Sequence, residues 1–382
     1  MELKERTKRG LAAIYSLCPR RHVATLAAGL IVLAHLLLRP NHALMRSLSK
    51  GFVRPLHDRL ALWLDALPFS LAEGLICLAA GLVGVYIIYQ VIMLFIRSER
   101  LKRVYITVIT LLMAVLIVYG GFTWLWGTHF YGDDFISESG LKSEKISKEQ
   151  LETVTEYFAA LSNEYAPQVQ RDERGAYTAD RDEILALSPQ VFAKTEKNFP
   201  CLQGPEVHAK GVRLSRALSY LDFTGFFFPF TGEANVNTDF PPSLFASTVA
   251  HELSHQRGVA KEQEANFTAV LACLEYGQAD YCYSACLMAY TYLGNALYGV
   301  DYEAWEQVYM SLSEPVLIDF AVNRAYWKQF ETPVQTVSNT VYEGLLYSYD
   351  PELGLKSYGA CVDLLVNYYY DDAVEYLKKT SG

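Results

Sequence analysis

Five consecutive residues, His251-Glu252-Leu253-Ser254-His255, could bind a metal ion and use it for hydrolysis. On a helix, two histidines four positions apart lie on the same face, so both imidazoles can coordinate one Zn²⁺ ion. Glu252 would then lie beside the open coordination position, where a carboxylate can take the proton of an activated water. The spacing therefore predicts metal-assisted hydrolysis, with zinc as the cofactor and Glu252 as the general base.

A third metal ligand must come from outside this pentapeptide. Arg257-Gly258 ends the helix, because glycine accepts the left-handed conformation common at helix ends. Only two other histidines occur beyond residue 126, so a carboxylate is the better candidate. Glu262 and Glu264 open the next apolar-faced helix and lie about 200° apart around it, so only one can face the metal. We favour Glu262 as the ligand, with Glu264 as the alternative.

Two further groups of residues could serve the same site. Asn266 shares a helical face with Glu262, and we expect it to orient a ligand histidine by a hydrogen bond. An extended stretch at residues 226–237 could present an exposed edge to the main chain of a substrate, through Glu233, Asn235 and Asn237. An ordinary strand with outward asparagines is the competing interpretation. His208, Tyr283 and Arg324 are candidates for stabilising the oxyanion of the transition state. Their spacing in the sequence does not favour any one of them.

The residues after the pentapeptide resemble a known element. Glu262-x-x-Ala265-Asn266 is similar to the E-x-x-[AS]-[DN] element of the gluzincin metallopeptidases, such as thermolysin-like and CAAX-prenyl-protease-like enzymes. This resemblance implies that Glu262 is the third zinc ligand. Only six residues separate His255 from Glu262, fewer than the usual gluzincin insertion. Lys261 stands where a metzincin would have its third histidine, which disfavours that family.

Most of the chain also resembles an uncharacterised bacterial membrane protein family, the family of unknown function numbered 3810. The resemblance rests on three apolar N-terminal stretches and on three sequence elements, namely Pro68-Phe69-Ser70, Pro229-Phe230-Thr231-Gly232-Glu233 and residues 251–267. It implies a zinc-peptidase-like domain outside the cytoplasm, and it does not indicate which substrate that domain would act on.

The first third of the chain contains the segments that would anchor this domain in a membrane. Residues 74–96 and 104–126 carry no charge, and at about 1.5 Å per residue each can cross a hydrocarbon layer of roughly 30 Å. Residues 23–38 are predicted to be a first, shorter membrane helix, with a cleaved signal peptide as the alternative. Basic residues cluster before this helix and between the other two, which places both flanks in the cytoplasm. Residues 127–382 should then lie outside.

The net charge also differs between residues 1–126 and residues 127–382. The 382 residues have a net charge of −9, but residues 1–126 hold 15 basic and 6 acidic side chains, which leaves 18 and 36 for residues 127–382. This acidity argues against nucleic-acid binding, which needs Lys and Arg against phosphates. We expect a mainly α (α+β) protein: a membrane anchor at 1–126, and a mostly helical, zincin-like extracytoplasmic domain with a small β element at 127–382.

The predicted function is that of a membrane-anchored zinc metallopeptidase that hydrolyses peptide or other amide bonds. Its partners would be the lipid bilayer and a peptide or protein substrate. The alternative is a non-catalytic zinc-binding receptor or assembly protein derived from a peptidase fold. An intramembrane protease is disfavoured, because His251 lies far beyond the last apolar stretch and charged residues follow it closely.

Overall fold

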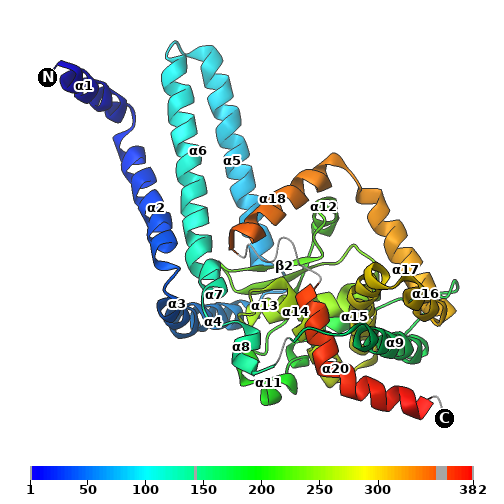
Figure 1. Ribbon diagram of the computed structural model, residues 1–382. Helices are drawn as coiled ribbons and strands as arrows, with labels where there is room; N and C mark the ends of the chain where they lie inside the picture. The colour runs from blue at the N-terminus through cyan, green and yellow to red at the C-terminus, as the bar shows by residue number, and fades with distance from the viewer. Residues whose placement is uncertain (1, 142–143, 350–358, 381–382) are drawn as a thin grey trace. The chain divides into compact units, whose positions relative to one another are not determined.

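The computed structural model describes residues 2–141, 144–349 and 359–380. Helices make up most of these residues, and one small sheet accompanies them (Figure 1). The predicted mainly helical chain with a small β element is therefore confirmed. The chain divides into two compact units, of which the first contains Met1–Val53 and Leu71–Gly132, and the second contains Arg54–Ser70 and Asp133–Gly382.

The first unit consists of helices only, within its described residues. They are α1 (Glu2–Leu17), α2 (Pro19–Leu38), α3 (His42–Leu48), η1 (Ser49–Val53), α5 (Leu71–Ile96), α6 (Arg100–Phe122), η2 (Thr123–Gly127) and α7 (Thr128–Phe130). Helices α5 and α6 form an antiparallel pair, and α2 packs against α6 (Figure 1). Three stretches are long and apolar enough to cross a membrane, namely Pro19–Leu38, Leu71–Ile96 and Arg100–Phe130. They contain the three segments predicted from the sequence.

The second unit is built around a helical core and a three-stranded sheet. Its longer helices are α4 (Arg54–Leu64), α9 (Lys148–Tyr165), α13 (Phe245–Gln256), α14 (Glu262–Tyr276), α15 (Ala279–Val300), α16 (Tyr302–Met310), α17 (Glu314–Trp327), α18 (Pro333–Tyr349) and α20 (Gly359–Thr380). The shorter ones are α8 (Phe135–Ser139), η3 (Ala166–Gln168), α10 (Arg181–Leu187), η4 (Ser188–Gln190), α11 (Thr195–Asn198), η5 (Pro200–Leu202), α12 (Ser215–Tyr220), η6 (Pro242–Leu244) and η7 (Lys328–Phe330). Helix α9 begins where the sequence signals it, because Ser147 and Gln150 form a complete capping box.

The sheet lies against the helix that carries the histidines. Its strands are β1 (Lys210–Val212), β2 (Gly225–Phe228) and β3 (Glu233–Asn237), in the spatial order β1-β3-β2. The central strand β3 runs parallel to β1 and antiparallel to β2, and all five of its residues are buried. Helix α13 packs on β3 and β2, while α14 and α15 pack on α13. The histidine helix is therefore held between the sheet and two long helices.

A segment between two of the apolar stretches belongs to the second unit. The sequence assigns Arg54–Ser70 to the anchor, whereas in the structure it packs on the sheet. The Ser70 hydroxyl donates a hydrogen bond of 2.6 Å to the Asn235 side-chain oxygen. The ammonium of Lys210 donates to the main-chain carbonyls of Asp65 and Leu67 at 2.8 and 2.6 Å. These contacts join the Pro-Phe-Ser element to the sheet.

Candidate metal centre

Two histidines lie one turn apart on α13, near the end of this buried helix. The helix ends as the sequence predicts, because Gly258 has φ +86° and its N–H donates to the carbonyl of His255. The N–H of Val259 donates to the carbonyl of Ser254, which completes a Schellman motif. This turn brings the chain back towards the histidines, so the start of α14 lies beside them.

Glu262, the first residue of α14, meets both histidines. Its Oε2 atom lies 3.2 Å from Nε2 of His251 and 3.5 Å from Nε2 of His255. One ligand atom from each of the three side chains lies within 4.8 Å of the other two. Two imidazole nitrogens and one carboxylate oxygen make a donor set that suits zinc. Glu262 keeps 28% of its side-chain surface exposed, so solvent can reach the cluster.

Two further groups hold the ligands in place. The carbonyl of Val259 accepts a hydrogen bond of 2.7 Å from Nδ1 of His255, which leaves Nε2 of that ring for the cluster. The hydroxyl of Tyr342 on α18 donates to Oε1 of Glu262 at 2.8 Å, while Oε2 faces the histidines. His255 and Glu262 are thus oriented by a main-chain carbonyl and by a tyrosine 80 residues away in the sequence.

Glu252 follows His251 on α13, and its side chain is 3% exposed. Its Oε2 atom has no hydrogen-bond partner among the described residues. Gly225 of β2 provides the space for this side chain, since a Cβ atom at Gly225 would lie 2.5 Å from Oε1 of Glu252. The carboxylate is therefore packed against a strand and has one oxygen available for a proton or a water molecule.

The charges in the cluster are strongly coupled. Burial raises the pKa of Glu252 to about 7, although the two histidines oppose this rise. Burial lowers the pKa of His255, but Glu262 outweighs this effect and the value rises to about 9. Burial raises the pKa of Glu262, and His255 and His251 outweigh it, so this pKa is well below its usual range. Glu252 thus has a pKa that suits a general base, while Glu262 is a stable anion.

Glu264, the alternative ligand, points elsewhere. Its Oε2 atom accepts a hydrogen bond of 2.8 Å from the main-chain N–H of Phe135, and Lys261 lies 4.0 Å from its Oε1 atom. Lys261 also pairs with Asp134 at 2.5 Å. Glu264 is therefore a buried residue that ties α14 to the start of α8, and the structure brings Glu262 to the histidines.

Asn266 does not orient either histidine, because Nδ1 of His255 is bonded to Val259 and Nδ1 of His251 has no hydrogen-bond partner among the described residues. The prediction for the edge strand is wrong as well. Strand β3 lies between β1 and β2 and is buried, so Glu233, Asn235 and Asn237 do not form an exposed edge. The edge next to Glu252 is instead β2, whose described pairing is to β3 alone.

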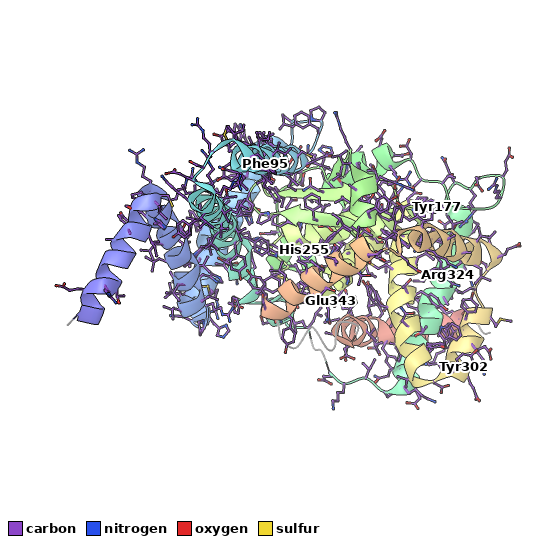
Figure 2. All side chains as sticks on the ribbon, turned by 90° about the horizontal axis from the view of Figure 1, so that it is seen from above. Phe95, Tyr177, His255, Tyr302, Arg324 and Glu343 are labelled. Carbon is purple, nitrogen blue, oxygen red and sulfur yellow. The ribbon has the colours of Figure 1, made fainter. Side chains whose placement is uncertain are left out.

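The three oxyanion candidates make other contacts. The ring of His208 faces Asp65 at 3.1 Å, and Tyr283 donates to Asp319 at 2.5 Å. Arg324 lies on α17, apart from His255 in the view of Figure 2. The tyrosine at the cluster is Tyr342, which sequence reasoning missed. No signal distinguishes it among the 27 tyrosines, because the fold alone brings α18 to α14.

Comparison with known proteins gives one match. The family model described as "Protein of unknown function (DUF3810)" matches residues 49–366, which include the Pro-Phe-Ser element, the sheet and the metal-centre residues. No curated protein and no solved structure matches the chain. Since the family model covers most of the sequence, the chain belongs to the DUF3810 family.

Proposed function

We propose that this protein is a membrane-anchored zinc metallopeptidase with a zincin-like second unit. One observation carries the proposal: the side chains of His251, His255 and Glu262 bring three ligand atoms within 4.8 Å of one another, beside a buried carboxylate with an unpartnered oxygen. A site of purely structural zinc would fill its fourth position with another protein ligand. Within the described residues, this cluster offers three protein ligands, so a fourth position would stay open for water or substrate.

The residues of the chain have separate roles in the proposed hydrolysis. A zinc ion held by His251, His255 and Glu262 would supply Lewis acidity that activates water. Glu252 accepts the proton of the attacking water, whose oxygen bonds to the carbonyl carbon of the substrate. The C–N bond then breaks, and Glu252 passes the proton to the leaving nitrogen. The hydroxyl of Tyr342 donates to Oε1 of Glu262 and would hold this ligand in place.

Strand β2, at the end of the sheet, supports a peptide as the substrate. A Cβ atom at Gly225 would lie 2.5 Å from Oε1 of Glu252, so a main chain that approached this part of the strand would lie beside the carboxylate. A peptide bound there would have its amide bonds close to the general base. A peptide therefore fits the site better than an isolated amide.

The experiment that tests the proposal is Glu252→Gln in the full chain. We expect stoichiometric zinc in both proteins, by metal analysis, and loss of hydrolysis of a fluorogenic peptide library in the variant. Glu303→Gln, on an exposed part of α16, is the matched control and should keep its activity. Normal turnover by Glu252→Gln would contradict the mechanism. Bound zinc without hydrolysis in the wild type would favour a non-catalytic receptor.

The second unit is proposed to lie outside the cytoplasm. Three stretches can cross a membrane, and basic residues flank α2 at its start and connect α5 to α6. A reporter fused after residue 382 tests this topology. Alkaline phosphatase should be active there and a fluorescent protein dark, and the reverse result would place the unit in the cytoplasm.

A further inference from the structure

Helix α4 exposes large apolar side chains on the side opposite its buried residues. Three of its residues are buried, namely His57, Ala61 and Leu64, and the helix packs on β3. The ring of His57 also packs edge-on against Phe227 of β2, at 5.2 Å between centroids. Leu62 and Trp63 are 56% and 78% exposed, and the helical spacing places them on the other side of α4. The sheet therefore covers one face of α4 and leaves an apolar face outward.

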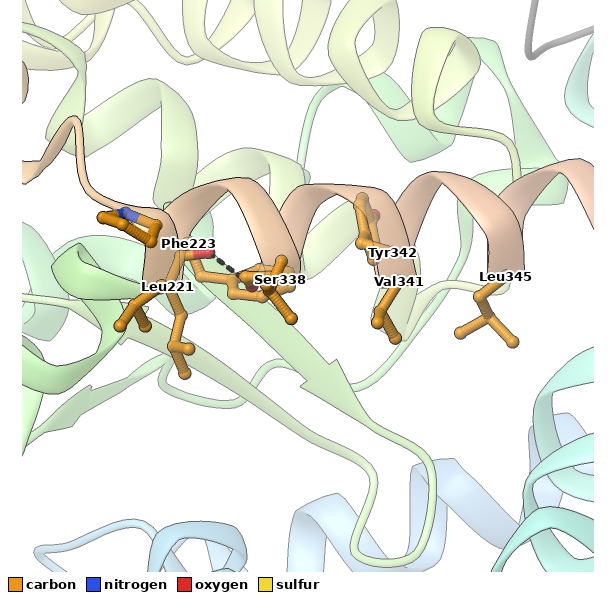
Figure 3. A pocket seen from close by; sticks show the side chains of 9 residues that line it. Leu221, Phe223, Ser338, Val341, Tyr342 and Leu345 are labelled. Atoms are coloured by element: carbon orange, nitrogen blue, oxygen red, sulfur yellow. Dashed lines mark hydrogen bonds between the residues drawn. The ribbon is translucent and has the colours of Figure 1, made fainter.

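Exposure alone does not identify what covers an apolar face. Helix α18 also exposes apolar side chains, beside a groove of about 710 Å³ whose lining includes Tyr342 (Figure 3). That helix begins more than 200 residues after the last described stretch that can cross a membrane, so its place in the chain indicates no occupant. Helix α4 differs, because such stretches lie on both sides of it in the sequence.

The chain holds α4 close to the start of a membrane-crossing stretch. Pro19–Leu38 precedes α4, and only six residues separate Leu64 from Leu71, where the next stretch begins. At no more than about 3.6 Å per residue, Leu64 lies within about 25 Å of that start whatever path the chain takes. Phe69, two residues before the stretch, is 41% exposed. Since α5 is proposed to cross the bilayer, α4 must lie at or near the bilayer surface.

The outward residues of α4 are of the types that membrane surfaces favour. Tryptophan is enriched at the boundary between headgroups and acyl chains, because its ring is apolar and its N–H needs a polar partner. Arg59 is exposed on the same face, three residues before Leu62, and an arginine there can reach lipid phosphates. Residues 39–70 hold five basic and two acidic side chains, whereas residues 127–382 hold 18 and 36. Positive charge beside apolar side chains fits a phospholipid surface.

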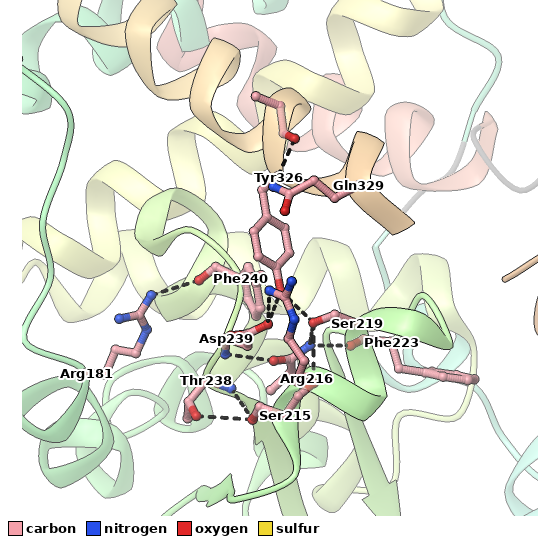
Figure 4. Close-up of polar contacts among 12 residues, drawn as sticks. Arg181, Ser215, Arg216, Ser219, Phe223, Thr238, Asp239, Phe240, Tyr326 and Gln329 are labelled. Atoms are coloured by element: carbon pink, nitrogen blue, oxygen red, sulfur yellow. Dashed lines mark hydrogen bonds and ion pairs between the residues drawn. The ribbon is translucent and has the colours of Figure 1, made fainter. Parts of the chain in front are cut away.

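Contact between α4 and lipid would orient the whole second unit, because α4 is fixed to the sheet and the sheet to the helices. Ser70, which ends the inserted segment, donates to Asn235 of β3. Just beyond β3, Tyr326 of α17 donates to Asp239 at 2.6 Å, and Arg216 of α12 pairs with the same carboxylate at 3.2 Å (Figure 4). Helix α13 packs on the same strand. The candidate metal centre would thus keep a constant distance from the bilayer.

We propose that the outward face of α4, formed by Arg59, Leu62 and Trp63, docks the second unit on the phospholipid surface of the membrane that α5 crosses. The inference rests on the membrane anchoring in the proposed function and not on its hydrolysis. Leu62 and Trp63 enter the boundary between headgroups and acyl chains, and Arg59 pairs with phosphate groups.

The fluorescence of Trp63 in the full chain, reconstituted into phosphatidylcholine–phosphatidylglycerol vesicles, tests the docking. The difference between the wild type and Trp63→Phe gives the contribution of Trp63 and keeps an aromatic ring at this exposed position. Lipids brominated near the headgroup should remove most of this contribution, and acrylamide in the water should scarcely quench it. The control is Trp305→Phe, because Trp305 stacks on Tyr309 of α16. The contribution of Trp305 should resist the brominated lipids.

A charge on the same face provides a second test. Leu62→Asp should raise the quenching of Trp63 by acrylamide, since a charge is costly at the boundary with the acyl chains. Thr340→Asp, at an exposed position of α18, adds the same charge elsewhere and should leave Trp63 unchanged. Equal quenching of Trp63 in Leu62→Asp and Thr340→Asp would count against the docking.

A Trp63 contribution that acrylamide quenches and brominated lipids do not would overturn the proposal. Shielding from both quenchers, together with a smaller oligomeric mass in Trp63→Asp, would assign the face to a second copy of the chain. Release of the chain from vesicles by alkaline carbonate would refute the anchor and the docking together. Quenching of Trp63 by lipid in a chain without hydrolysis would refute the peptidase alone, whereas hydrolysis with Trp63 in water would refute the docking alone.

Discussion

Gly225 leaves the space that the Glu252 side chain occupies. A Cβ atom there would lie 2.5 Å from Oε1 of Glu252 and 2.8 Å from the carbonyl of Asn235. Gly225→Ala should therefore displace Glu252, the proposed general base, and lower the free energy of unfolding by about 1–3 kcal/mol, as overpacking does. Chemical denaturation and peptide hydrolysis check both effects. Gly299→Ala, on a helix with nothing within 4 Å, should leave both unchanged or slightly improve stability, and a tolerated Gly225→Ala would contradict this packing.

Tyr342 contacts the candidate metal centre through its hydroxyl, which donates to Glu262. Tyr342→Phe keeps the ring that lines the groove and removes the hydrogen bond to Glu262. We expect zinc affinity to fall by about 10- to 100-fold, because groups that orient a ligand have effects of this size. Competition with a fluorescent zinc chelator measures the change. Tyr347→Phe, at an exposed position of the same helix, is the control, and equal zinc affinities for the two variants would refute the role of Tyr342.

At the residue scale, the sequence predicts site residues that lie close together in the chain and misses contacts between residues that lie far apart in it. His251, Glu252 and His255 follow from their spacing on one helix. Glu262 follows from the scarcity of other histidines beyond residue 126 and from the resemblance of residues 262–266 to the gluzincin element. No residue type in the sequence indicates that the main-chain carbonyl of Val259 contacts His255, although Gly258 indicates the turn that places it there. Tyr342 lies 80 residues from its partner Glu262, and no local pattern could connect the two.

The turn between α13 and α14 sets the geometry of the whole centre. Gly258 has φ +86°, so Gly258→Ala strains the turn by about 1–2 kcal/mol and shifts the Val259 carbonyl from His255. Gly277→Ala is a matched control, because Gly277 ends α14 at φ +82° with nothing within 4 Å. Both variants should lose similar stability in thermal unfolding. Only Gly258→Ala should lose zinc affinity, and a similar loss in Gly277→Ala would show that strain alone is responsible.

At the element scale, strand order is the part that the sequence could not supply. An extended stretch was recognisable at residues 226–237, and it forms the hairpin of β2 and β3. Whether β3 is an edge depends on β1, which pairs with it in parallel from more than 20 residues upstream. The alternation of side chains along a strand shows which residues share a face. It does not show which other strands pair with that strand. The substrate edge was therefore assigned to β3, whereas β3 is the central strand and the strand beside Glu252 is β2.

At the scale of the whole molecule, the boundary between the units is not a single point in the sequence. The apolar stretches were recognisable because membrane helices need length and hydrophobicity alone. Arg54–Ser70 lies between two of them and belongs to the second unit through contacts of its polar groups. Charge and hydropathy could not separate this segment from the anchor. The chain therefore passes between the two units three times, after Val53, after Ser70 and after Gly132.

His57, in this inserted segment, should make the stability of the second unit depend on pH. Burial lowers its pKa from 6.5 to about 4, although the carbonyl of Pro229 opposes this. The unfolded chain takes up the proton as the pH falls below 6.5, while the folded chain resists it down to about 4. The free energy of unfolding should therefore fall by about 3 kcal/mol over this range on account of His57. Denaturation of the wild type and of His57→Gln at pH 7, 6, 5 and 4 measures the difference. Between pH 7 and pH 4 the wild type should lose more stability than His57→Gln. Equal losses in the two proteins would show that His57 does not resist protonation.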